Sequence, residues 1–483
     1  MINEKIVFFG TGGKLKYEKE KHPEIFDHLN IVAYLDNNSA LHKKVLGGIP
    51  ILPPEEICRL EYDKIILMAD YVKEMWQQLM VLGVPSDKIF LWNEFLCAGR
   101  HGTFMEYGNQ RSFHDDRKKV LMISTDLNYN GGTIAVLYAA IALMQQRYSV
   151  TVSAPGAEPK LIKEMGRQKI CLVIAPAIHF PQTEEIEWIS QFDIVIVNVF
   201  QMLRCACIVS RVRPVLWWLH ESSSSYTRAY PLTRDNHWEY DNVDAMKYLH
   251  IMAVSVKAKE NFNHYYKSRI REILPYGIPD TYMPGKKKEH KKHVFAVIGE
   301  VYQLKAQKIF LEAISMLTEK ERNNVEFWLI GKCGNDPYAS EVKRKARKIS
   351  EIKMLGELTR DQMRAAYENI DIVVCPSLEE TMSLTITEGM MLGKICITTD
   401  ATGISDYMED KVNGLICKAG STDGLYLKMK WVLENTDMWE QIRKQARKTY
   451  ENHFTMEKFG IRLQKAIEDT MHENRGERQG NLA

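Results

Sequence analysis

The sequence predicts an α/β protein with three parallel-sheet units, and three observations support this prediction. The chain has 483 residues, which at roughly 150 residues per domain corresponds to about three domains. Short β-branched runs alternate with longer stretches of helical periodicity, as in βαβ units. Two polar segments, at residues 101–117 and 286–293, interrupt this alternation and separate three series of elements.

Each series has its own expected strands, which are the short apolar and β-branched runs. The first series contains Ile6–Phe9, Ile31–Leu35, Lys64–Met68 and Lys88–Leu91. The second begins at Val120 and continues through Val150–Ser153, Ile194–Val197, Val215–Leu219 and Met252–Ser255. The third contains Phe295–Gly299, Glu326–Gly331, Ile370–Cys375 and Ile395–Thr399. Because helical stretches separate these runs, each series predicts a mainly parallel sheet covered by helices.

These breaks give the domain boundaries that we expect. Residues 1–100 form a Rossmann-like N-terminal domain, and 101–117 form a linker. Residues 118–285 and 286–470 form two Rossmann-like lobes, with the C-terminal helix expected to pack back on the first lobe. Such lobes leave a cleft at the carboxyl ends of their strands, where ligands bind. Residues 471–483 lack apolar periodicity and are predicted to be a frayed tail.

Composition and charge exclude several classes of protein. The chain is 45% hydrophobic and 26% charged, and its net charge of +2 gives no nucleic-acid footprint. Its nine cysteines are odd in number and scattered, which favours neither a disulfide framework nor a zinc site. The N-terminus lacks the pattern of a signal peptide, so we expect a cytoplasmic protein. The basic run 286–293 leaves peripheral contact with the inner face of a membrane as an alternative, although such runs are usually only solvated.

The segment from Pro376 to Lys394 carries the clearest chemical pattern. It follows an apolar strand, and a helix is expected from about Thr385 to Gly393. The free N–H groups at the start of that helix and its positive end would form a phosphate site. Glu380 lies in the loop before the helix. Glu388 lies about one turn inside it, where a carboxylate can accept hydrogen bonds from a ribose diol.

This segment resembles the signature of family 4 of the glycosyltransferases, which are retaining enzymes of GT-B fold. The resemblance covers roughly residues 118–465 and matches Pro376, Ser377, Glu380 and Glu388. It implies two lobes that face a cleft, here with an additional N-terminal α/β domain. It also implies transfer of a hexose from a nucleotide sugar, with UDP as the expected nucleotide, to a glycan or lipid-linked acceptor.

The same resemblance assigns residues to the donor. It implies that Glu380 acts at the donor sugar and that Glu388 holds the ribose. The backbone amides that follow Glu380 are implied to contact first the sugar and then the diphosphate, in the order Thr381, Met382, Ser383, Leu384 and Thr385.

Two motifs of the first lobe agree with this assignment. Gly131 and Gly132 stand just before an expected helix, where glycines let the backbone approach a ligand closely. The resemblance implies that they border the donor phosphates or the acceptor. His220 follows the strand LWWL and matches a family histidine that contacts the donor sugar. We expect it to bind a sugar hydroxyl near the reaction centre.

Lys305 provides the expected partner of the leaving group. It matches the lysine of a basic pair that holds the diphosphate in the family, and a fixed cation stabilises the charge that develops there. The sequence departs from the family at Glu300, where an arginine is usual. A carboxylate near a diphosphate would repel it, so Glu300 must turn away or another base such as Lys308 must compensate.

The sequence contains no Asp-x-Asp pair, the usual ligand of a metal–diphosphate complex. We therefore expect transfer that needs no metal and no cofactor besides the donor. Retention of the anomeric configuration follows from the resemblance alone. In the expected mechanism the diphosphate leaves toward Lys305 and the helix amides, and the acceptor hydroxyl enters from the same face.

The front domain contains a second candidate site. Gly10, Gly12 and Gly13 follow its first strand, and Asp36 ends its second, as in a unit that binds a dinucleotide or nucleotide sugar. The third glycine of that fingerprint is missing, and Asp36 is close enough to be a strand-end cap. A nucleotide site and a purely structural or docking role are both open.

Two other functions remain as alternatives to a transferase of bacterial surface polysaccharide synthesis. One is an epimerase or dehydratase that uses NAD or a nucleotide sugar in the front domain, although no suitable catalytic Tyr and Lys are found. The other is a non-catalytic partner of another transferase, for which Glu300 is the best argument.

Overall fold

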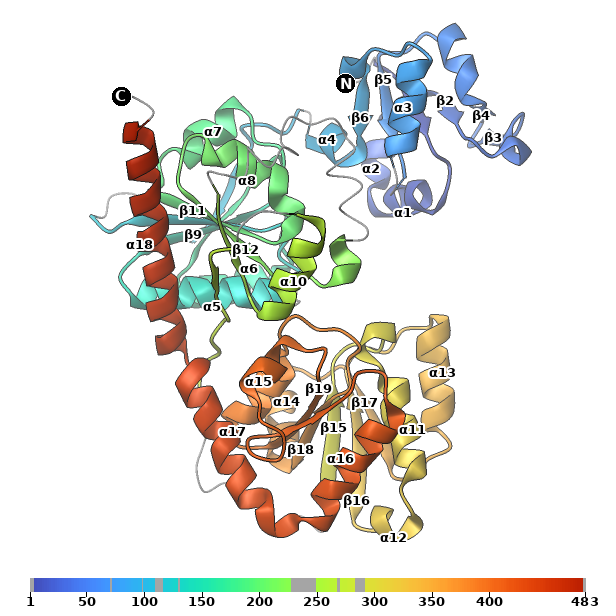
Figure 1. Ribbon diagram of the computed structural model, residues 1–483. Helices are drawn as coiled ribbons and strands as arrows, with labels where there is room; N and C mark the ends of the chain where they lie inside the picture. The colour runs from blue at the N-terminus through green and yellow to red at the C-terminus, as the bar shows by residue number, and fades with distance from the viewer. Residues whose placement is uncertain are drawn as a thin grey trace.

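The computed structural model describes residues 4–69, 72–97, 99–108, 116–128, 131–226, 249–266, 270–282 and 292–480. These residues form three parallel-sheet units that follow one another along the chain (Figure 1). The basic run 286–293 falls mostly outside the described residues, so its contact with a membrane is not addressed by the fold.

The front sheet has the strand order β3-β4-β2-β1-β5-β6. Its strands are β1 (Lys5–Phe9), β2 (Asn30–Leu35), β3 (Val45–Leu46), β4 (Ile49–Leu52), β5 (Lys64–Leu67) and β6 (Ile89–Leu91). All neighbours are parallel except β3 and β4, a hairpin that the sequence analysis does not predict. Gly47 and Gly48 form its two-residue turn with φ of 62° and 83°, angles that favour glycine. Its helices are α1 (Gly13–Lys21), α2 (Pro23–Phe26), α3 (Lys73–Val81) and α4 (Trp92–Cys97).

The second sheet has the order β14-β13-β12-β11-β8-β9-β10-β7. Its strands are β7 (Met105–Tyr107), β8 (Lys119–Ile123), β9 (Ser149–Ala154), β10 (Cys171–Ile174), β11 (Ile194–Asn198), β12 (Val215–Leu219), β13 (Leu249–Ala253) and β14 (Glu272–Ile273). The named helices of this first lobe are α5 (Gly131–Gln145), α6 (Pro159–Arg167), α7 (Thr183–Ile189), α8 (Leu203–Ser210) and α10 (Val256–Tyr265). Its central strands are buried along their whole length, as expected for a sheet covered on both faces.

The third sheet is parallel throughout, with the order β17-β16-β15-β18-β19-β20. Its strands are β15 (His293–Ile298), β16 (Val325–Ile330), β17 (Ile352–Gly356), β18 (Ile372–Cys375), β19 (Ile395–Thr399) and β20 (Leu415–Cys417). The helices of this second lobe are α11 (Gln307–Met316), α12 (Glu319–Arg322), α13 (Pro337–Ala346), α14 (Arg360–Asn369), α15 (Leu384–Met391), α16 (Thr422–Glu434) and α17 (Trp439–His453).

A long final helix connects the two lobes. α18 (Met456–Gly480) leaves the second lobe after α17 and runs along the first lobe, as the red helix in Figure 1 shows. Its Phe459 ring lies 5.7 Å from the ring of Trp218. Gly460 lies against α5, where an added Cβ would come within 3.2 Å of Gln146. The buried core of the first lobe therefore continues into the last two helices.

The structure corrects two expectations about chain segments. The segment 101–117 is not wholly a linker, because β7 pairs antiparallel with β10 at the edge of the second sheet. Its three side chains are all exposed, so no apolar run marks this strand in the sequence. Residues 471–480 are not a frayed tail but continue α18. They carry no apolar periodicity, and the helix that they extend is anchored to the first lobe by its earlier turns.

Candidate functional site at the lobe interface

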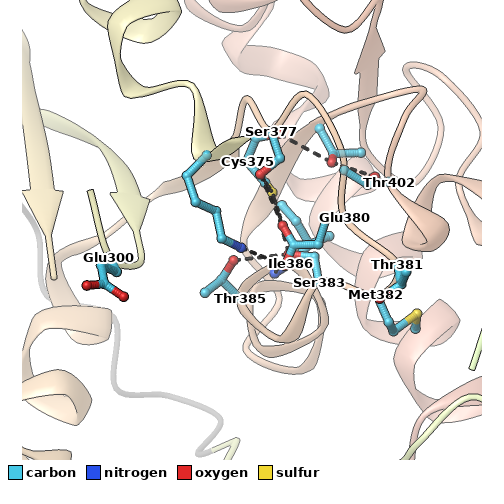
Figure 2. A network of polar contacts seen from close by, with 12 residues as sticks. Glu300, Cys375, Ser377, Glu380, Thr381, Met382, Ser383, Thr385, Ile386 and Thr402 are labelled. Atoms are coloured by element: carbon cyan, nitrogen blue, oxygen red, sulfur yellow. Dashed lines mark hydrogen bonds and ion pairs between the residues drawn. The ribbon is translucent and has the colours of Figure 1, made fainter. Parts of the chain in front are cut away.

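The loop between β18 and α15 forms the centre of the candidate site. Ser383 is the N-cap of α15, and its hydroxyl accepts a hydrogen bond from the N–H of Ile386 at 3.4 Å. Leu384 and Thr385 therefore occupy the first turn, as expected, where backbone N–H groups have no partner within the helix. The positive end of α15 points to the side of the loop that carries Glu380 (Figure 2).

Glu380 is held by three side chains from two parts of the second lobe. Its Oε1 lies 2.8 Å from Nζ of Lys305, which precedes α11. Its Oε2 accepts hydrogen bonds from Ser377 at 3.1 Å and from the thiol of Cys375 at 3.2 Å. Figure 2 shows these groups converging on the carboxylate. Cys375 is not singled out by the sequence analysis, because a cysteine at a strand end carries no distinctive signal.

The charges in this cluster are fixed by their contacts. Burial lowers the pKa of Lys305, but Glu380, Cys375 and Tyr302 together raise it by more, so the pKa lies above its usual value and the lysine stays charged. Burial, together with Glu380, raises the pKa of Cys375 to about 11, so its thiol stays protonated and donates. The cluster therefore contains a cation that is neutralised by one carboxylate.

Glu300 lies outside this cluster. Its side chain is exposed, and Figure 2 shows it apart from Glu380 with no dashed line reaching it. Lys308 does not compensate for it, because its Nζ binds Glu341 of α13 at 2.6 Å. Of the two arrangements that the sequence allows, the structure has the one in which Glu300 turns away.

The first lobe brings a second helix N-terminus to the same place. α5 begins at Gly131 and Gly132, and an added Cβ on Gly131 would lie 3.7 Å from Cδ1 of Leu384. The starts of α5 and α15 therefore face each other across the lobe interface. Two positive helix ends at one point favour an anion there.

His220 lies at the end of β12, beside the loop that carries Glu380. Its carbonyl oxygen accepts a hydrogen bond from Thr381 Oγ1 at 2.6 Å. Its Nε2 is buried and has no hydrogen-bond partner within the described part of the chain. Burial lowers the pKa of His220 to about 3, so the imidazole is neutral.

Glu221 holds the backbone beside His220. The sequence places it at the same strand end, facing the cleft, but predicts no role for it. Its carboxylate accepts hydrogen bonds from the N–H groups of Phe200 at 2.7 Å and His220 at 2.9 Å. Burial raises the pKa of Glu221 to about 7, although these two N–H groups lower it. The adjacent Val199 has a φ of 72°, which is unusual for a β-branched residue. Glu221 thus connects His220 to a strained turn.

Glu388 lies one turn inside α15, as expected. The hydroxyl of Tyr367 on α14 donates to its Oε2 at 2.6 Å. Burial raises the pKa of Glu388, although the hydrogen bond from Tyr367 lowers it. Glu388 does not join the Glu380 cluster and lies on the wall of a separate cavity.

Residues around Glu380 also contact the first lobe directly. The carboxylate of Glu379 accepts hydrogen bonds from Ser223 Oγ at 2.8 Å and Asn261 Nδ2 at 3.1 Å. The carbonyl oxygen of Met382 accepts from Tyr276 OH at 3.0 Å. Because these contacts pair residues more than 100 positions apart, no local pattern predicts them.

The glycine turn of the front domain is placed as expected, but its acid is already occupied. Gly10 has a φ of 104° at the end of β1, and Gly13 begins α1 after Gly12. Asp36 accepts hydrogen bonds from Thr11 N at 2.9 Å and Thr11 Oγ1 at 2.5 Å. Of the two roles that the sequence allows, the strand-end cap is the one these contacts describe.

The described residues contain no group of three or more His, Cys, Asp or Glu side chains placed to hold a metal ion. In the same part of the chain, no helix is both long and apolar enough to cross a membrane.

Two family descriptions match separate parts of the chain. Residues 280–449 match "Glycosyl transferases group 1", and residues 2–90 match "C2185-like, N-terminal". Among solved structures, HepE from Anabaena, crystallised with UDP and glucose, is 16% identical with a TM-score of 0.61. The match covers 73% of this chain and 100% of HepE. The fold is GT-B.

A second solved structure agrees with this GT-B fold. WaaG is described as a glycosyltransferase involved in lipopolysaccharide biosynthesis, and it is 15% identical with a TM-score of 0.53. The match covers 71% of this chain and 98% of the WaaG chain. At this level of identity, the two solved structures show a shared fold, which is the arrangement of the two GT-B lobes. The front unit lies outside the regions that a two-lobed GT-B protein contains.

Curated relatives are similar over shorter stretches. An N-acetylgalactosaminyltransferase of Campylobacter jejuni that acts on N,N'-diacetylbacillosaminyl-diphospho-undecaprenol is 24% identical, over 41% of this chain and 48% of the relative. The lipopolysaccharide 1,2-N-acetylglucosaminetransferase of Salmonella typhimurium is 24% identical, over 36% and 48%. Sulfoquinovosyl transferase SQD2 of Arabidopsis thaliana is 26% identical, over 25% and 24%. This chain spans about a quarter to a half of the length of these relatives.

Proposed function

We propose that this protein is a retaining glycosyltransferase that moves a hexose from a UDP-linked donor to a glycan or lipid-linked acceptor. The observation that carries this proposal is the meeting of Lys305, Glu380 and two helix N-termini at the interface of the GT-B lobes. A nucleoside diphosphate leaves with negative charge, and fixed donors at that point stabilise it. HepE, which has the same fold, is described with UDP and with UDP-glucose, which supports the choice of donor.

The Lys305–Glu380 ion pair gives a specific account of donor binding. Without a donor, each group neutralises the other. The donor diphosphate would replace Glu380 as the partner of Lys305, and Glu380 would then turn to the sugar hydroxyls. Lys305 is already charged before the donor arrives, because Glu380 and its neighbours hold its pKa above the usual value. Lys305 therefore does not have to take up a proton when the diphosphate binds.

The remaining residues have separate roles in the proposed transfer. The amides of Leu384 and Thr385 at the start of α15 would bind the diphosphate. His220 has a buried ring nitrogen without a partner in the described chain, which suits a sugar hydroxyl. Glu388 would hold the ribose. The acceptor hydroxyl would enter on the face from which the diphosphate leaves, which retains the anomeric configuration.

The biological setting is also a proposal. Two of the curated relatives act on lipopolysaccharide or on a sugar linked to undecaprenyl diphosphate, which supports a role in bacterial surface polysaccharide synthesis. We infer a cytoplasmic protein that meets its acceptor at the inner face of the membrane. The alternatives are less well supported, because Glu300 turns away from the site and Asp36 is occupied by Thr11.

The test is a transfer assay with purified protein and a panel of UDP-linked and other nucleotide sugars. We expect one donor to be consumed, with EDTA having no effect, and NMR of the product to show the donor's anomeric configuration. The Glu380→Gln variant should lose most transfer while keeping its fold, because the side chain is nearly isosteric. Transfer that is unchanged in this variant would contradict the proposed site, and an inverted product would contradict the proposed mechanism.

A further inference from the structure

A cavity of about 650 Å³ lies beside the hinge between the two lobes. It is enclosed by α14, the carboxyl end of α15, α17 and the hinge residues 278–282. Tyr138 of α5 also lines it, so both lobes contribute to its wall. Among the described residues proposed above to bind the donor, Glu388 alone reaches this cavity. The Glu380 cluster lies at the opposite end of α15.

The wall of this hinge cavity is rich in cations. Its lining includes the acids Glu368, Asp371, Glu388 and Glu440. It also includes six basic residues, which are Arg360, Arg364, Lys394, Arg443, Lys444 and Arg447. Basic residues thus outnumber acids in a wall that belongs to a chain with nearly balanced charge. A cleft lined mainly by one sign of charge concentrates ions of the opposite sign.

Some of these charged side chains already form ion pairs within the protein. Arg443 binds Asp371 at 2.9 Å, and Arg360 binds Glu164 of α6 at 3.3 Å. Glu388 accepts a hydrogen bond from Tyr367, and burial raises its pKa. Arg447 likewise binds Asp280 and Glu451. Because Arg360 and Arg447 use carboxylates outside the wall, these contacts remove the excess of bases over acids, and the site depends on particular side chains.

Arg364 and Lys444 are the two cations of the wall whose side chains have no partner among the described residues. They lie on different helices, α14 and α17, and both side chains are exposed. Neither makes a hydrogen bond or ion pair with any other residue in the described parts of the chain. The two cations lie on different helices that line one cavity, and neither has a protein partner. Two such cations can bind different oxygens of one multivalent oxyanion.

The cavity is not only charged. Met363 and Leu392 line it together with the buried Met391, and three tyrosines, Tyr138, Tyr282 and Tyr367, add aromatic surface. A small hydrated ion would leave this apolar surface uncovered. Concave sites with a mostly apolar wall and a few polar anchors are typical of sites for organic ligands.

We propose that the hinge cavity binds a phosphate-bearing ligand at Arg364 and Lys444, with the organic part of the ligand against the methionines and tyrosines. This site goes beyond the proposed sugar transfer, with which it shares the side chain of Glu388. The phosphate can come from a soluble molecule or from a lipid headgroup. Because the wall includes Tyr138 of the first lobe and the hinge itself, an occupant would hold the two lobes together.

The first experiment measures binding of pyrophosphate to the full-length protein by calorimetry at constant ionic strength. Because Lys305 offers a second site for a diphosphate, the measurement uses the Lys305→Ala variant as its background. We expect binding to persist in that background. The added pair Arg364→Gln and Lys444→Gln should then weaken it at least tenfold, through loss of two charge-assisted contacts.

A matched control separates the cavity from general charge. Arg344→Gln and Lys348→Gln remove the same charge from exposed positions on and just after α13, away from the hinge. This control pair should leave pyrophosphate binding within twofold of the background. Both pairs replace exposed side chains, so thermal melting of each should match the background and show that the fold is intact.

The second experiment identifies a lipid source. The full-length protein is sedimented with vesicles of phosphatidylglycerol and with vesicles of neutral phosphatidylcholine. Sedimentation with the anionic vesicles that falls at least tenfold in the cavity pair, but not in the control pair, supports a lipid phosphate. Binding of pyrophosphate without such sedimentation supports a soluble ligand. If neither measurement responds to the cavity pair more than to the control pair, the proposal is overturned.

Discussion

At the scale of single residues, the candidate site depends on which charges are paired. Lys305 and Lys308 are three positions apart, yet their Nζ atoms bind different carboxylates, Glu380 and Glu341. This divergence arises because Ala306 adopts a left-handed conformation, with a φ of 52°, between the short helix that ends at Lys305 and the start of α11. One lysine therefore faces the lobe interface and the other faces α13.

This divergence predicts different effects for two similar substitutions. Lys305→Ala should weaken donor binding by about ten- to hundredfold, because a charge-assisted contact contributes about 1.5 to 3 kcal/mol. Lys308→Ala serves as the matched control and should leave donor binding nearly unchanged. Titration calorimetry with the donor identified by the transfer assay measures both. Equal losses in the two variants would contradict the assignment of Lys305.

Glu221 predicts a pH dependence of stability. Its pKa is about 7 in the folded protein, against an ordinary value of 4.5. Between these two values the folded state keeps the proton that the unfolded state has lost. The free energy of unfolding should therefore fall as the pH rises from 4.5 to 7, by up to about 3 kcal/mol from this group.

The Glu221→Gln variant isolates this contribution. Glutamine does not titrate, so the difference in unfolding free energy between wild type and variant should change with pH in the stated direction. Urea unfolding followed by tryptophan fluorescence from pH 4.5 to 8 measures it. Buried histidines affect both proteins alike and cancel in the difference. Parallel curves for the two proteins would show that the Glu221 carboxyl titrates normally.

At the scale of elements, the loop after β19 explains how closely the lobes can approach. Gly403 begins the short helix that follows β19, and its N–H donates to the carbonyl oxygen of Glu380 at 2.8 Å. An added Cβ would lie 1.9 Å from the carbonyl oxygen of Thr381 and 2.6 Å from Cβ of Ser255. Three segments from both lobes thus meet at a point with no room for a side chain.

Gly403→Ala should therefore disturb the site without touching a ligand. The methyl group must displace the Thr381 backbone or Ser255, at a cost of about 1 to 3 kcal/mol. We expect a lower melting temperature and a large loss of transfer. Gly166→Ala, on a helix with open space around it, is the matched control and should not destabilise the protein. Normal transfer by Gly403→Ala would show that this contact does not position Glu380.

At the scale of the whole molecule, the front unit is attached to the first lobe by specific contacts. Glu94 of α4 binds Arg204 of α8 at 3.1 Å. Glu185 of α7 is buried and accepts hydrogen bonds from His101 Nδ1 and from the Gly102 N–H, both at 2.8 Å. The segment after the front domain thus satisfies a buried carboxylate of the lobe and adds the edge strand β7.

These contacts predict how the chain tolerates shortening. A chain that begins at residue 99 keeps His101, Gly102 and β7, whereas one that begins at residue 117 loses all three. Leaving a buried carboxylate without its hydrogen-bond donors costs about 3 kcal/mol. We therefore expect the shorter chain to melt at a clearly lower temperature than the chain from residue 99. Identical melting of the two would show that these contacts add no stability.

Much of the fold follows from local patterns in the sequence. The alternation of buried strands and helices predicts most strands of the three sheets, and the apolar run before Pro376 predicts β18 and the loop after it. Short edge strands such as β7 and β17 are not predicted, because their side chains are largely exposed and carry no apolar run. The helical end of the chain is missed because it has no apolar face to recognise.

Only part of the candidate site can be predicted from local patterns in the sequence. Glu380, Lys305 and His220 are found because each stands at a fixed place in a local motif, whereas Glu388, predicted in the same way, lines a separate cavity. Glu379 and Cys375 are missed, and Glu221 is placed at the cleft without a role, since their importance comes from partners brought close by the fold.

The sequence by itself determines the three series of strands and helices, the loop that carries Glu380 and the helix start that follows it. These depend on local periodicity, capping and turn residues, which act over a few positions. Only the tertiary structure decides that Lys305 pairs with Glu380, that Glu300 turns away and that α5 faces α15. It also decides that basic side chains of α14 and α17 share one cavity. Those relations depend on packing between segments far apart in the chain, which no local pattern encodes.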